Sequence, residues 1–160
     1  MNLHPELAPV AFLLGTWEGD GEGDYPTVQP FRYRERTSFT HDGRPFMFYE
    51  QRTWRTGPDG SEMPSHTELG MLRGYADGTV EAVIVQTTRT AEAAIGSAHD
   101  NRLELQPHAI AQAPTAKLVE GLWRVFALED GVLHVTVDMA AMGLARGFHL
   151  DARLRPVGDS

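Results

Sequence analysis

Apolar and polar residues alternate along most of the chain with a period of two. The clearest case is residues 133–139, where Leu, Val, Val and Met alternate with His, Thr and Asp. This period is typical of strands that bury one face. The predicted strands cover residues 31–39, 46–54, 66–73, 79–88, 102–106, 110–115, 122–128, 133–139 and 148–154.

Turn signals separate these strands, among them HDGR at 41–44, TGPDG at 56–60, ADG at 76–78 and EDG at 129–131. One short helix is predicted over residues 5–14, with Pro5 in its first turn and Gly15 ending it. Many short strands without a long helix or a repeat predict an all-β fold, either an antiparallel barrel or a sandwich. Closure into a barrel would leave no exposed strand edge.

The most informative motif is GTWEGDG at residues 15–21. Its glycines, Gly15, Gly19 and Gly21, let the backbone pass close to another backbone or a ligand. Trp17 supplies a large apolar side chain between them. A buried Trp among such glycines suits the first strand of a small closed β-barrel.

Composition narrows the function further. The 160 residues suit one domain, 1–160, with a sizeable core. The net charge of −8 argues against a binder of nucleic acid or of anionic membranes, since both need a basic face. The absence of Cys excludes disulfides, thiolate haem ligation and iron–sulfur clusters. Because no segment reads as a signal peptide or a membrane span, a cytoplasmic location is expected.

Candidate metal and catalytic motifs are mostly missing. The acidic run DGEGD at 20–24 fails as a calcium loop, because Tyr25 stands where the required Gly belongs and Phe31 where the terminal Glu belongs. The seven histidines form no zinc motif, and no nucleophile-elbow serine is present. His134 lies on the polar side of its strand and is expected to face solvent.

His149 is the histidine with a distinctive context, since the small, soft apolar stretch MAAMGL at 139–144 precedes it. Such a stretch can line a flat cofactor, and one neutral imidazole can hold haem iron. Simple alternation nevertheless groups His149 with Asp151 and Arg153, on the outer face. A bulge permitted by Gly147 would turn the ring inward. The residues alone favour the outward reading.

The chain as a whole resembles the nitrobindin family of haem-binding β-barrels, which are also peroxynitrite isomerases. The resemblance runs nearly end to end in one order. Its segments are HP at 4–5, LLGTWEGDGEG at 13–23, YPTVQPF at 25–31, FTHDGRPF at 39–46, YEQRTW at 49–54, TAK at 115–117, MAA at 139–141, HL at 149–150 and LR at 154–155.

The resemblance implies an up-and-down barrel of about ten strands with one haem b per chain at an open end. It places the axial iron ligand at His149, Thr27 at the haem, and Lys117 at the haem rim. It further implies that the protein binds nitric oxide and isomerises peroxynitrite to nitrate through His149-ligated ferric haem. Two glycines and an Arg in the loop before His149 depart from the family pattern and are expected to reshape the haem edge.

Three alternatives stay open at this point. The protein can be a carrier or sensor of haem or nitric oxide without turnover. It can be a lipocalin-like carrier of an apolar ligand without iron. It can also be a barrel without a ligand that binds a partner protein. The sequence leaves open whether the protein is a monomer or a homodimer.

Overall fold

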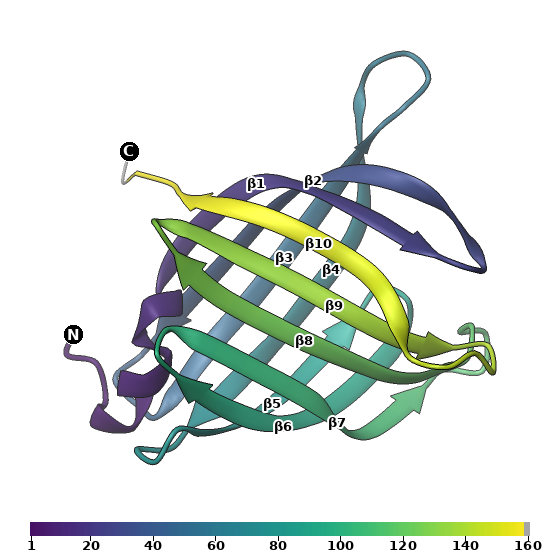
Figure 1. Ribbon diagram of the computed structural model, residues 1–160. Coiled ribbons are helices and arrows are strands. Elements are labelled where there is room, and N and C mark those ends of the chain that lie inside the picture. The colour runs from purple at the N-terminus through teal and green to yellow at the C-terminus, as the bar shows by residue number, and fades with distance from the viewer. Residues whose placement is uncertain (159–160) are drawn as a thin grey trace.

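Ten antiparallel strands close into a barrel in the computed structural model, which describes residues 1–158 (Figure 1). Each strand pairs with its neighbours in sequence, and β1 pairs with β10 to close the ring. The strands are β1 Gly15–Tyr25, β2 Val28–His41, β3 Phe46–Thr56, β4 Glu62–Gly74, β5 Thr79–Gln86, β6 Thr90–His99, β7 Arg102–Gln112, β8 Val119–Glu129, β9 Val132–Ala141 and β10 Gly147–Pro156. The prediction of an all-β up-and-down barrel of about ten strands is confirmed.

Two details of the predicted strands were wrong. The strand β6 was missed, because its alanines and glycine give a weak strand signal. The segments 102–106 and 110–115 are one strand, β7, which continues past Pro107. A register shift opposite Ala93 and Ala94 leaves His108 as the extra residue, and this bulge accommodates the proline.

A short helix closes one end of the barrel. It is the 3₁₀ helix η1, Pro5–Leu13, and lies beside the turns at one end in Figure 1. Its buried side chains Leu7, Val10 and Leu13 belong to the main core cluster. Gly15 follows with a φ of +115°, which glycine adopts readily, so the predicted helix end is confirmed. No helix within residues 1–158 has the length and apolarity to cross a membrane.

The glycine motif brings β1 close to its neighbours. A Cβ at Gly19 would lie 2.0 Å from the backbone carbonyl oxygen of Arg153 on β10, a distance that no side chain tolerates. Trp17 is buried, and its Nε1 donates a hydrogen bond to the carbonyl of Leu13 at 2.8 Å. The predicted close backbone approach and buried Trp are both confirmed, and together they tie the helix to the first strand.

Because consecutive strands alternate in direction, five turns lie at the end opposite η1. They connect β1 to β2, β3 to β4, β5 to β6, β7 to β8 and β9 to β10. Because η1 covers its own end of the barrel, the interior is reached from the opposite end, where these five turns lie.

Candidate functional site

A cavity of about 180 Å³ opens into the barrel at this end. Apolar side chains from β8 to β10 form one wall, among them Leu122, Val137, Met139 and Leu150. Met139 belongs to the soft stretch that the sequence singled out. The opposite wall and the floor carry polar side chains from β2 to β5. One cavity therefore combines an apolar surface with a polar interior.

His149 lines the cavity because β10 contains a bulge. Phe148 pairs with Asp138, but Leu150 pairs with Val137, so His149 is the extra residue between two adjacent positions of β9. A bulge places consecutive side chains on the same face. His149 and Leu150 accordingly both line the cavity, whereas Phe148 is exposed. The outward orientation expected from simple alternation was wrong, and the inward orientation expected from a bulge is confirmed.

The imidazole of His149 is held in one tautomer. Its Nδ1 donates to the backbone carbonyl of Asp24 at 3.2 Å, and the ring of Tyr25 meets it edge-on with centroids 6.0 Å apart. Burial lowers the pKa of His149 below its ordinary value. The ring is therefore neutral near pH 7, with Nδ1 protonated and the Nε2 lone pair free to bind a metal.

Thr27 and Lys117 lie at the same end of the barrel but outside the cavity wall. Thr27 is exposed in the turn between β1 and β2. Lys117 is exposed in the loop between β7 and β8, where its carbonyl accepts a hydrogen bond from Gln112 Nε2 at 2.7 Å. Neither side chain has a hydrogen-bond partner within residues 1–158. Their contact with the haem and its rim therefore stays a prediction.

The loop before His149 is held against the outside of the barrel. Arg146 pairs with Asp138 at 3.0 Å, and its guanidinium lies over the ring of Trp123, 4.6 Å from the ring centre. Met142 and Gly143 take left-handed φ values of 54° and 77°. The unusual Arg of this loop thus fixes the turn rather than entering the cavity.

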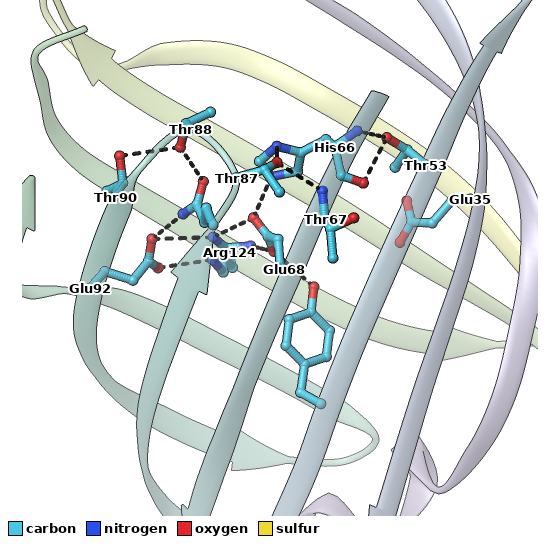
Figure 2. Close-up of polar contacts among 12 residues, drawn as sticks. Glu35, Thr53, His66, Thr67, Glu68, Thr87, Thr88, Thr90, Glu92 and Arg124 are labelled. Atoms are coloured by element: carbon cyan, nitrogen blue, oxygen red, sulfur yellow. Dashed lines mark hydrogen bonds and ion pairs between the residues drawn. The ribbon is translucent and has the colours of Figure 1, made fainter. Parts of the chain in front are cut away.

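A buried ion cluster forms part of the cavity wall (Figure 2). Arg124 is 3% exposed and sits between two glutamates that are equally buried. Its Nη1 and Nη2 donate to Glu68 at 2.7 and 3.1 Å, while Nε and Nη2 donate to Glu92 at 3.0 and 3.2 Å. Four hydrogen bonds of the guanidinium therefore go to these two carboxylates.

Glu68 is the centre of this cluster. It also accepts hydrogen bonds from Tyr49 Oη at 2.9 Å and from His66 Nε2 at 3.1 Å. Burial alone would raise the pKa of Glu68, but the charge of Arg124, reinforced by His66, holds it well below its usual range. Glu68 is therefore ionised, and its hydrogen bond fixes His66 against the wall of the cavity.

Glu35 forms a second buried polar group, next to the cavity and on β2. It is 2% exposed, and Thr37 Oγ1 donates to its carboxylate at 2.6 Å. Burial raises the pKa of Glu35 from 4.5 to about 7, although bonds from Thr37 and Gln51 oppose the rise. Nearby, Gln51 Oε1 is buried without a hydrogen-bond partner among residues 1–158. Near pH 7, Glu35 is therefore present in both its neutral and its charged form.

Sequence reasoning missed both polar groups. They were missed because some strands carry apolar side chains on the outer face of the barrel and polar ones on the inner face, the reverse of the usual order. On β4, Leu69 and Met71 are about half exposed, while Glu68, directly before Leu69, is buried. In the sequence, the only signal was the order of Glu68 and Leu69 along β4, which places the polar residue on the inward-facing side of the strand.

Comparison with known proteins gives consistent results. The model of the family described as "THAP4-like, heme-binding beta-barrel domain" matches residues 6–155. A peroxynitrite isomerase of Streptomyces griseus is 46% identical over 95% of this chain and 84% of its own length. One of a Nocardioides species is 43% identical over 96% of this chain and 94% of its own. The crystal structure of Rv2717c from M. tuberculosis superposes with a TM-score of 0.89 at 34% identity, covering 98% of this chain and all of that one.

Proposed function

The chain belongs to the THAP4-like, heme-binding β-barrel family, the nitrobindins, and from this premise we propose that it isomerises peroxynitrite to nitrate. In this proposal one haem b per chain is bound through His149. The observation that carries the proposal is the orientation of His149, whose ring a bulge of β10 turns into the cavity with Nδ1 on the Asp24 carbonyl and no partner for Nε2 within residues 1–158. The other histidine of the cavity wall, His66, has its Nε2 bound to Glu68. The two relatives named above are peroxynitrite isomerases that match over nearly the full chain.

The residues of the cavity fit a haem. The Asp24 carbonyl holds the proton on Nδ1, which leaves Nε2 as the donor atom that haem iron requires. The apolar wall beside it, formed by residues such as Met139 and Leu150, suits a flat porphyrin face. When bound, ferric haem supplies the Lewis-acid and redox chemistry of the reaction.

The chain's own residues have a limited task in this reaction. Peroxynitrite and nitrate have the same atoms and the same charge, so no proton need be gained or lost overall. His149 anchors the cofactor, and the closed barrel with its η1 cap admits ligands only from the turn side. Nitric oxide needs only a metal, so its binding at the same position is part of the proposal. Thr27 and Lys117 are proposed to contact the haem rim.

A carrier that buries the carboxylate of an apolar acid deep in the barrel is disfavoured by one observation. Such a carboxylate would need a cation in the barrel interior. The buried arginine there is Arg124, whose four hydrogen bonds all go to Glu68 and Glu92. Two carboxylates already face its single positive charge, so a third one buried beside them would lack a compensating cation. A cytoplasmic location remains the expectation drawn from the sequence.

A titration of the apoprotein with ferric haem tests the proposal. Saturable one-to-one binding with a shift of the Soret band is expected, and His149→Ala should abolish or greatly weaken it. The matched control is His134→Ala, because His134 points away from the cavity and pairs with Asp151 at 3.0 Å. Normal haem loading by His149→Ala would refute the assigned ligand.

Turnover is tested separately. Stopped-flow measurement of peroxynitrite decay and of nitrate yield, per haem, should exceed that of free haem at equal concentration. Decay no faster than with free haem would leave a haem or nitric oxide carrier and refute the enzyme.

A further inference from the structure

Most polar groups that line the cavity are already committed to protein partners. Arg124 is bound by two carboxylates, and His66 Nε2 donates to Glu68. His149 Nδ1 is used by a backbone carbonyl. Among the arginines of the cavity wall, Arg55 differs, because no carboxylate of residues 1–158 forms an ion pair with it.

Arg55 occupies the mouth of the cavity. Along β3 the alternate residues Tyr49, Gln51, Thr53 and Arg55 all line the cavity, and Arg55 is the one nearest the strand's end. Arg55 is exposed, whereas Tyr49, Gln51 and Thr53 are buried. A cation at this position faces both the cavity and solvent.

The guanidinium of Arg55 is held by an aromatic ring. Its central carbon lies 4.0 Å from the centre of the Phe31 ring. Phe31 in turn lies over Gly23, where a Cβ would come within 2.2 Å of the Phe31 ring. The glycine thus makes room for Phe31, and Phe31 limits the orientations of Arg55. A preoriented guanidinium loses less entropy when it binds an anion.

Other cations at this end of the barrel are used differently. Arg146 pairs with Asp138 on the outer surface. Arg89 donates to the carbonyl of Thr115 and ties two turns together. Neither of these arginines lines the cavity. Lys117 is exposed in the loop between β7 and β8 and does not line the cavity either. Arg55 is therefore the cationic side chain of the cavity wall itself that has no ion-pair partner within residues 1–158.

We propose that Arg55, held on Phe31, is a carboxylate-binding site that receives a propionate of the haem. The inference rests on the proposed function. A porphyrin held by His149 would keep its apolar part in the cavity and its carboxylates at the wet mouth. Arginine's planar fork matches a carboxylate and can bind it with two parallel hydrogen bonds. The site would fix the orientation of the porphyrin within the cavity.

The test compares two porphyrins and two variants. Ferric haem and its dimethyl ester, which has no carboxylates, are titrated into the unaltered protein, Arg55→Gln and Arg52→Gln. Arg52 is the matched control because it lies on the same strand, outside the cavity, paired with Glu50. Arg55→Gln should weaken haem binding roughly ten- to hundred-fold and leave the ester unaffected. Arg52→Gln should change neither affinity.

The outcomes separate the two proposals. Failure of the unaltered protein to bind haem would refute the proposed function itself. Haem binding that Arg55→Gln leaves unchanged, or an equal loss for haem and ester, would overturn only the role of Arg55. Unchanged haem affinity with slower peroxynitrite decay would also overturn it and assign Arg55 to the anionic substrate. Equal thermal unfolding of both variants would confirm that folding is intact, and partial rescue by Arg55→Lys would support the role of charge.

Discussion

Replacing Glu35 by Gln should stabilise the protein at alkaline pH. Glu35 is fully buried on β2, and burial raises its pKa from 4.5 to about 7. Gln has nearly the same shape, so its carbonyl can still accept the bond from Thr37. Its amide can in addition donate to Gln51 Oε1, which has no partner among residues 1–158. The substitution therefore removes a buried charge and supplies a missing donor.

The magnitude follows from proton linkage. Above the folded-state pKa, the native protein holds an ionised Glu35 that is destabilised relative to the unfolded chain. A pKa of about 7 instead of 4.5 corresponds to at most about 3 kcal/mol. Between these two values the unfolded chain has lost the proton and the folded one keeps it. Stability from this group thus falls as the pH rises through the window and is constant above about pH 7.

The assay is urea unfolding of the apoproteins, because bound haem would add its own free energy. Glu35→Gln should be up to about 3 kcal/mol more stable than the unaltered protein at about pH 8. The two should converge near pH 4, where Glu35 is neutral in both states. Glu129→Gln, on an exposed side chain, is the control and should change little.

The reasoning fails if Glu35→Gln is no more stable than the unaltered protein at about pH 8. It also fails if the difference between the two does not depend on pH. Either result would mean that Glu35 is ionised in the folded protein without cost, with compensation from the nearby charge of Arg124.

Two further predictions concern packing. Arg124→Met should lower the free energy of unfolding by about 3–5 kcal/mol, because it leaves two buried carboxylates without their cation. Urea unfolding measures this loss, and a change below about 1 kcal/mol would contradict the stabilising role of the cluster. Gly19→Ala should cost about 1–3 kcal/mol, because its Cβ would lie 2.0 Å from the Arg153 carbonyl oxygen. Gly147→Ala, whose nearest atom is 4.0 Å away, is the control, and equal Tm values for the two variants would count against close strand contact at Gly19.

The sequence predicted much of the fold because the relevant signals are local. Period-two alternation and the turn residues located most strands and the all-β class. The glycine motif around Trp17 predicted a close contact between strand backbones, because only glycine lacks the Cβ that would prevent such a contact. The strand β6 was not predicted, because its small residues give a weak strand signal. The strand β7 was predicted as two strands on either side of Pro107, because the bulge that accommodates this proline depends on pairing with the neighbouring strand.

The site divides in the same way. His149 was predicted as a haem ligand from its sequence context and from the family resemblance. The direction of its ring was decided by the register of β10 against β9, where one extra residue turns the ring inward. The cluster around Arg124 joins Glu68 across 56 positions of the chain, so no local pattern could announce it. Alternation reports which residues share a face. Only closure of the barrel decides which face is inside, and here it buries Glu68 and leaves Leu69 exposed.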